Sequence, residues 1–228
     1  IWQGSCFYGI INGELIAGRS HAFMLSIEQL VLGIPALLLA ISFHEFAHGY
    51  AAYKLGDPTP KYQGRLTLNP LAHLDPIGAL MLLIFRFGWA RPVMINSSYF
   101  KDRRKGTLIV SLAGPFANFL LAWVFFNLGR FLPGYMPNLS LARSVSIFFL
   151  INVQYNLGLA AFNLLPFPPL DGSKVVASLL PARWAYSFNQ WARYGQIILV
   201  VLLITGGAQI VLNPIYRTLY LLIEKLSL

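Results

Sequence analysis

Residues 27–53 read IEQLVLGIPALLLAISFHEFAHGYAAY, an apolar run that carries two histidines and a glutamate toward its end. A helix rises about 1.5 Å per residue, so a bilayer core of about 30 Å is crossed by roughly 20 apolar residues. This stretch exceeds that length, and further apolar runs occupy residues 107–132, 144–166 and 194–212. The sequence therefore predicts an all-α polytopic membrane protein with a three-helix core and flanking helices.

The composition supports this class. Hydrophobic residues make up 57% of the chain and charged residues only 11%, against about 25% charged residues in an average soluble domain. The net charge is +9, and the basic residues lie between the apolar runs, as they do in cytoplasmic loops of membrane proteins. No basic stripe with interleaved aromatic residues is present, so we expect a lipid bilayer as partner and not a nucleic acid. Cys6 is the only cysteine, which excludes an intramolecular disulfide and a cysteine-based zinc site.

The loop charges predict the topology. Residues 77–90 would cover only about 21 Å as a helix, and Arg86 lies inside this run. The positive-inside rule places the basic loops 54–75, 91–106 and 173–193 in the cytoplasm. Because a spanning 77–90 would put the first two loops on opposite sides, we expect this segment to be re-entrant. Residues 215–226 are either an interfacial helix or a continuation of the preceding span.

The loops also suggest local strands. Residues 65–68 alternate in polarity, and residues 93–96 followed by 97–100 resemble a strand and a turn, which predicts a short membrane-proximal β-hairpin. We divide the chain into an N-terminal segment of residues 1–26, for which an interfacial position is one option, a membrane core of residues 27–175, and a C-terminal membrane helix with an amphipathic tail, residues 176–228.

The motif HEFAH at residues 44–48 matches H-E-x-x-H. A spacing of four puts His44 and His48 on one face of a helix, where they can share a metal ion, and places Glu45 beside them as a general base. Ionisable residues inside a spanning helix are costly and usually mark function. We therefore interpret the motif as a metal site and not as packed polar residues.

A catalytic zinc site usually needs a third protein ligand. The sequence offers His21, His73, Asp57, Asp75, Asp102, Asp171 and the remaining glutamates. Asp171 is best placed, because it shortly follows the run 144–166, whose end is expected in the same leaflet as the histidines. The prolines before Asp171 exclude an ordinary helix there. His73 lies among turn-forming residues, and we interpret it as a loop or capping residue.

These segments together resemble the site-2 protease family of intramembrane zinc metalloproteases. The matching motifs are HEFAH at 44–48, AGPFAN at 113–118 and residues 163–172, which end in Leu-Asp-Gly. They cover about residues 27–175. The resemblance implies one zinc ion per chain bound by His44, His48 and Asp171, with Glu45 activating water. For Asn163 it implies a role in substrate positioning or in stabilising the tetrahedral intermediate.

The resemblance further implies a membrane-associated hairpin between the first two core helices and a substrate that is a transmembrane protein already shortened by another protease. Because the sequence lacks the PDZ domain of some members and the CBS domains of others, regulation through those modules does not carry over. A substrate helix must unwind before cleavage, and Val93 and Ile95 are our candidates for holding it by β-addition. Asn118 contacts either the substrate or a neighbouring helix.

The predicted function is zinc-dependent endoproteolysis of transmembrane segments, in regulated intramembrane proteolysis. The protein is expected to be a multi-pass integral membrane protein, in the cell membrane, with its active site toward the cytoplasm. The alternatives are a catalytically silent scaffold that binds membrane helices and a metal-ion transporter. Glu45 argues against the scaffold, because metal binding alone needs no general base. Polar residues near one leaflet argue against the transporter. The sequence indicates neither the physiological substrate nor the oligomeric state.

Overall fold

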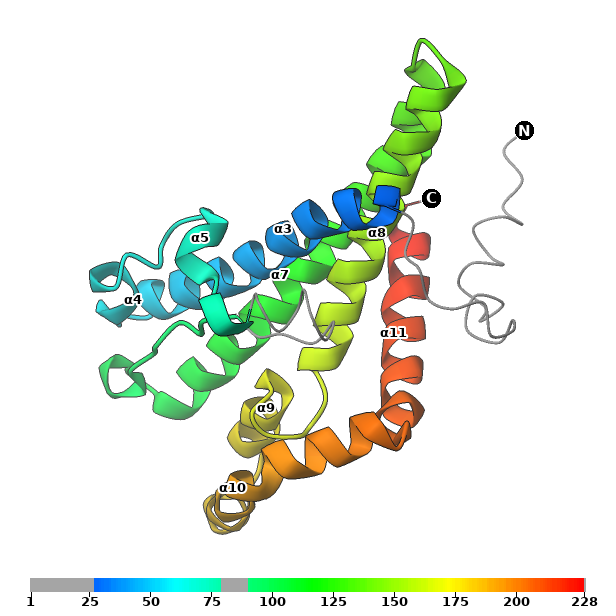
Figure 1. Ribbon diagram of the computed structural model, residues 1–228. Helices are drawn as coiled ribbons and strands as arrows, with labels where there is room; N and C mark the ends of the chain where they lie inside the picture. The colour runs from blue at the N-terminus through cyan, green and yellow to red at the C-terminus, as the bar shows by residue number, and fades with distance from the viewer. Residues whose placement is uncertain (1–26, 79–89, 228) are drawn as a thin grey trace. The chain divides into compact units, whose positions relative to one another are not determined.

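The computed structural model describes residues 27–78 and 90–227, in which long helices dominate (Figure 1). The three longest apolar helices are α3 (Ile27–Lys54), α7 (Arg103–Phe131) and α8 (Leu139–Asn163), and α7 continues into the short 3₁₀ helix η2 (Leu132–Tyr135). Each is long and apolar enough to cross a membrane. The prediction of a helical protein with long apolar helices is therefore confirmed, and three of the four expected spans are present as continuous helices.

Local sequence signals determine where these helices begin and end. The Asp102 side chain accepts hydrogen bonds from the backbone N–H groups of Arg104 and Lys105, and so caps the start of α7. Asn138 caps α8 in the same way through the N–H of Leu141. Helix α8 ends at Asn163, shortly before Pro166, which cannot donate a backbone hydrogen bond.

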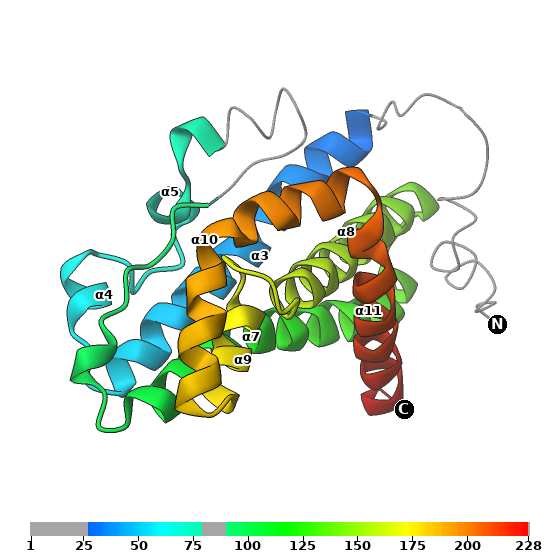
Figure 2. The same ribbon diagram turned by 90° about the horizontal axis from the view of Figure 1, so that it is seen from below.

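The core helices approach one another at small residues. Helices α7 and α8 run side by side from η2, and both views show α3 beside α7 (Figures 1 and 2). Ala36 and Ala40 on α3 are fully buried. A Cβ atom on Gly129 of α7 would lie 3.0 Å from the Phe149 Cβ atom of α8, so glycine lets these two helices come close.

Several short elements gather at the C-terminal end of α3 (Figures 1 and 2). They are α4 (Thr59–Tyr62), α5 (Pro70–His73) and the 3₁₀ helix η1 (Ser97–Tyr99). A hydrophobic cluster made of Ala52, Phe100 and Val110 joins α3, this loop region and the start of α7. The cluster fixes the loop that precedes α7 against the end of α3.

The predicted β-hairpin is wrong. Within the described residues the two candidate segments form no strand, and an isolated antiparallel bridge joins Leu74 and Ala90, which lie outside both segments. The physical reason is that side chains take the backbone donors. The N–H groups of Val93, Met94 and Asn96 donate to the side chains of Glu45, Gln63 and Asp57, respectively. The prediction that residues 77–90 are re-entrant concerns mainly residues 79–89, which lie outside the described residues, as does the segment 1–26.

The C-terminal region differs from the expected fourth span. Helix α9 (Asp171–Leu179) is followed by α10 (Ala182–Ile204) and α11 (Gly207–Leu226), which are bent by 84° relative to each other. Gly206 between them has φ +76°, a left-handed conformation that glycine adopts without steric cost. The apolar run 194–212 is therefore broken, and residues 215–226 continue helix α11 through Pro214.

Candidate metal centre

Two helices bring three metal-binding side chains together. His44 and His48 project from one face of α3, and Asp171 is the first residue of α9. The Nε2 atoms of the two histidines lie 3.0 Å apart, and the Asp171 Oδ2 atom lies 3.2 Å from His44 Nε2 and 2.9 Å from His48 Nε2. All three residues are buried. The structure thus brings the three predicted ligands together. Among the described residues, His44, His48 and Asp171 form a group that could hold a metal ion.

The hydrogen-bond partner of Nδ1 fixes the tautomer of each histidine ring. His44 Nδ1 lies 2.6 Å from the Oδ1 atom of Asn118, and His48 Nδ1 lies 2.7 Å from the carbonyl oxygen of Val110. Both oxygens accept, because the Asn118 Nδ2 group is used elsewhere as a donor. In neutral rings both Nδ1 atoms therefore carry the proton, and both Nε2 lone pairs face inward. Two lone pairs and a carboxylate at this spacing favour a shared cation, and nitrogen and oxygen donors of this kind fit zinc.

Gly114 provides the space beside these donors. A Cβ atom at this position of α7 would lie 2.4 Å from His48 Nε2 and 2.7 Å from His44 Nε2. A side chain here would therefore occupy the point where the two histidine nitrogens converge. The glycine of the AGPFAN segment is required by this close approach.

The Lys174 side chain holds Asp171 from the other side. Lys174 Nζ lies 3.1 Å from Asp171 Oδ1, which leaves Oδ2 directed at the histidines. Burial alone would raise the pKa of the Asp171 carboxyl, but when a proton in place of a metal ion lies between the imidazoles and Asp171, their hydrogen bonds and the Lys174 charge outweigh burial and keep this pKa well below its usual range. The Asp171 side chain is therefore a carboxylate at neutral pH.

Helix α9 is fixed at its other end by an arginine. The Arg104 guanidinium on α7 donates hydrogen bonds to the carbonyl oxygens of Ser178 and Leu180, where α9 ends. Carbonyl groups at a helix C-terminus have no partner within the helix and favour such cations. Arg104 thereby ties the helix that carries Asp171 to the start of α7.

A cavity of about 710 Å³ opens beside the three ligands. Glu45 and Asn163 line it, together with apolar residues of α3 and α8. Glu45 follows His44 directly, and its Oε2 atom accepts a hydrogen bond of 3.0 Å from the Val93 N–H. Asn163 Nδ2 donates one hydrogen bond to the Leu159 carbonyl and carries a second N–H. The predicted base and the predicted amide therefore share one cavity with the ligands.

The other predicted residues lie in different places. Val93 and Ile95 line the cavity. Asn118 is fully buried behind His44 and donates to Ala40 of α3 and Asn156 of α8. His73, interpreted as a loop or capping residue, is the last residue of α5, is buried, and its Nε2 atom lies 2.8 Å from the Thr67 carbonyl oxygen.

Sequence reasoning missed three contributors. Lys174 is three residues after Asp171 on one helix, a spacing that signals an ion pair. Arg104 lies in a basic run whose charges we assigned only to topology. The Val110 carbonyl has no sequence signal, because every residue carries a carbonyl and only the packing of α7 against α3 selects this one.

Comparison with known proteins identifies relatives. The family model for peptidase family M50 matches residues 32–205. The Bacillus subtilis protein named "Putative zinc metalloprotease YwhC" is 44% identical over 183 residues, which cover 79% of this chain and 84% of that protein. "Putative zinc metalloprotease Rip2" of Mycolicibacterium smegmatis is 34% identical over 181 residues, covering 77% of this chain and 67% of the relative. No solved structure matches the chain significantly.

Proposed function

The chain belongs to peptidase family M50, the site-2 protease family, and from this premise we propose how its residues carry out the reaction. The protein is an intramembrane zinc metalloprotease. Neither a silent scaffold nor a metal-ion transporter is favoured. The observation that carries the proposal is the convergence of His44 Nε2, His48 Nε2 and Asp171 Oδ2 beside a cavity that also contains Glu45.

We assign the zinc ligands to His44, His48 and Asp171. Zinc bound there would supply Lewis-acid chemistry, polarising a peptide carbonyl and acidifying water. The protein's contribution is to hold the three donors in place, through Asn118 and Val110 on the imidazoles and Lys174 on the carboxylate. Such outer partners orient the ligands of metal sites.

We assign the proton transfers to Glu45. Its carboxylate takes a proton from water as the water oxygen bonds to the peptide carbon, and it gives this proton to the departing amine as the C–N bond breaks. Asn163 lines the same cavity, and its second N–H is a candidate donor to the oxyanion that forms on the carbonyl oxygen. Water and substrate reach these groups through the cavity.

We propose that the substrates are transmembrane segments of other proteins, cleaved after another protease has shortened the substrate. The proposed base Glu45 and two of the metal ligands lie on α3, which can span a bilayer, and the third ligand Asp171 begins α9. A membrane helix hides its peptide bonds in its own hydrogen bonds, so a segment must unwind before it enters the cavity.

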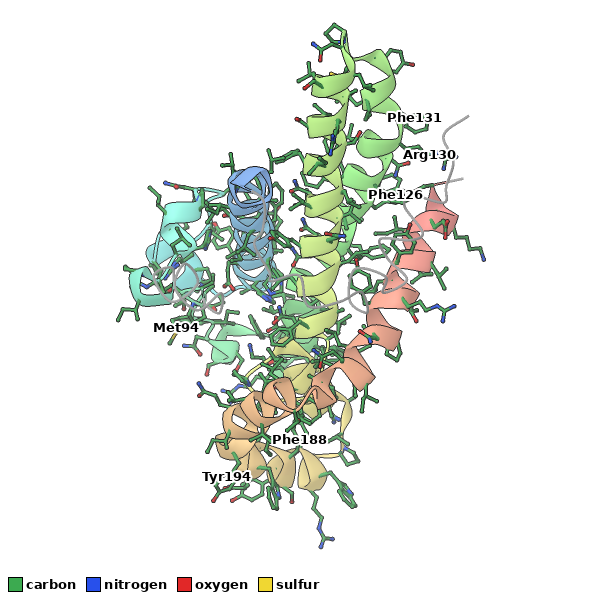
Figure 3. All side chains as sticks on the ribbon, turned by 45° about the vertical axis from the view of Figure 1, so that its right-hand side comes forward. Met94, Phe126, Arg130, Phe131, Phe188 and Tyr194 are labelled. Atoms are coloured by element: carbon green, nitrogen blue, oxygen red, sulfur yellow. The ribbon has the colours of Figure 1, made fainter. Side chains whose placement is uncertain are left out.

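We further propose that the centre faces the cytoplasm. Many basic residues surround the end of the helical core that carries α4, α5 and α9: Lys54, Lys61, Arg65, Lys101, Arg103, Arg104, Lys105 and Lys174. Figure 3 shows Arg130 and Phe131 at the opposite end of α7 from α10, which carries Phe188 and Tyr194. The excess of positive charge at the end with the metal centre supports this orientation.

The experiment that tests the function compares the wild-type protein with Glu45→Gln in liposomes that contain a single-span test substrate. Bound zinc is measured in both proteins. We expect cleavage by the wild type only, with equal zinc content, because glutamine cannot accept the proton. Cleavage by Glu45→Gln at the wild-type rate would refute the assignment of Glu45, and folded protein without zinc would refute the metal centre.

A further inference from the structure

The carboxylate of Glu45 is held by a backbone amide from a distant part of the chain. The Val93 N–H donates to Glu45 Oε2 at 3.0 Å across 48 residues of sequence. We propose that this amide is a positioning group for the general base. It fixes Oε2 and leaves Oε1 to carry the proton from water to the leaving amine. The inference rests on the proposed role of Glu45 as the base.

The Val93 side chain packs against α3 one helical turn beyond the base. The residue is only 8% exposed. A Cβ atom built on Gly49 would lie 3.6 Å from Val93 Cγ1, so the valine packs against Gly49, one helical turn beyond Glu45. Both the amide and the side chain of Val93 therefore contact one short stretch of helix.

The segment is also anchored on both sides of Val93. On the N-terminal side, the Arg91 N–H donates to the His73 carbonyl at 2.8 Å, and the Arg91 carbonyl accepts from Arg65 at 3.3 Å. On the C-terminal side, the Asn96 N–H donates to Asp57 Oδ2 at 2.7 Å.

Asp57 is fully buried, and its other oxygen accepts from the Thr59 N–H at 2.9 Å. The second anchor is thus itself fixed. A donor held on both sides loses little freedom when it binds the carboxylate, so the base keeps one orientation.

This arrangement changes the expected role of Val93. An N–H group makes one strong hydrogen bond, and the Val93 N–H makes it with Glu45. A substrate strand that pairs with this segment cannot use the same donor unless Glu45 releases it. The Val93 amide therefore belongs to the cavity wall and at the same time orients the Glu45 carboxylate.

The test replaces this amide by an ester, using the α-hydroxy acid analogue of valine at position 93 in the full-length protein. The ester removes the N–H and keeps the side chain. We expect kcat to fall by about 10- to 100-fold, the range typical of losing a partner that orients a group at a metal site, with KM and bound zinc unchanged.

The matched control is the same replacement at Met94. The Met94 N–H donates to Gln63 Oε1 at 3.4 Å and does not contact the base, and Met94 is 63% exposed (labelled in Figure 3). We expect the control to retain the wild-type kcat. A kcat for the position-93 ester equal to that of the position-94 ester would overturn the inference.

A second measurement separates positioning of the base from binding of substrate. Affinity for the test substrate is measured in Glu45→Gln, with and without the ester at position 93. If Val93 acts on the base, the two affinities are equal, whereas weaker binding with the ester would overturn the inference in favour of a substrate contact. Failure of the proposed function is a different result, namely cleavage by Glu45→Gln itself.

Discussion

His44 Nδ1 lies 2.6 Å from Asn118 Oδ1, which connects α3 to α7 directly behind the metal centre. The Asn118 amide also donates to the Ala40 carbonyl at 2.9 Å and to Asn156 Oδ1 at 2.8 Å. One buried side chain therefore joins three helices and at the same time determines which nitrogen of His44 faces the metal. The same hydrogen bond between Asn118 and His44 therefore joins two helices and orients a proposed metal ligand.

Asn118→Leu should weaken zinc binding. Leucine leaves the His44 Nδ1–H without an acceptor in a buried position, so we expect zinc affinity to fall by about 10- to 100-fold. The measurement is zinc competition with a chelating dye in detergent. Asn118→Asp keeps an acceptor and should lose less affinity than Asn118→Leu.

The control for Asn118 is Asn127→Leu on the same helix. Asn127 bonds Trp123 and Ser227 away from the metal centre, and its removal tests the general loss of a polar contact between helices. We expect this variant to bind zinc like the wild type. Equal zinc affinity in Asn118→Leu and Asn127→Leu would contradict the orienting role.

Gly114→Ala should obstruct the metal centre. The added methyl group would lie 2.4 Å from His48 Nε2, and the histidines can move only by breaking their Nδ1 hydrogen bonds. Overpacking of this kind costs about 1–3 kcal/mol, which corresponds to a loss of roughly 5- to 150-fold in zinc affinity. Zinc titration and cleavage assays measure the effect. Gly158→Ala is the control, because a Cβ atom there meets no neighbour within 4 Å.

Gly172→Ala should displace Asp171. A Cβ atom at position 172 would lie 2.4 Å from the carbonyl oxygens of Leu164 and Leu165, which are backbone atoms and cannot rotate away. We expect the free energy of unfolding in detergent to fall by about 1–3 kcal/mol, and the zinc content to fall with it. Gly134→Ala, also without a neighbour within 4 Å, should behave as the wild type. A Gly172→Ala protein that binds as much zinc as the wild type would contradict this prediction, because Asp171 would then keep its position despite the added methyl group.

The orientation can be tested by cysteine labelling. In a Cys6→Ser background, Lys101→Cys marks the end of the core with the metal centre, and Tyr135→Cys, at a position 85% exposed, marks the opposite end. A membrane-impermeant maleimide added to intact cells should label position 135 only, and lysis should then expose position 101. The reverse pattern would place the metal centre outside the cytoplasm.

The sequence by itself determined the features that depend on local geometry and on solvent. A spacing of four residues puts His44 and His48 on one helix face in any helical fold. Long apolar runs with few charges can be stable only in a membrane or in a large core, and this predicted α3, α7 and α8. The predicted topology and the motif resemblance both pointed to Asp171, but only the turn between α8 and α9 brings its carboxylate to the two histidines.

Tertiary structure decided the features in which a backbone group meets a side chain far away in sequence. The strand pattern at 93–96 predicted a hairpin, but Glu45, Gln63 and Asp57 accept its N–H groups, and no local rule anticipates such partners. Hydropathy treated 194–212 as one span because it ignores backbone dihedral angles, whereas the positive φ of Gly206 breaks the helix. Every residue offers the same amide and carbonyl, so only packing selects the Val110 carbonyl for His48 and the Val93 amide for Glu45.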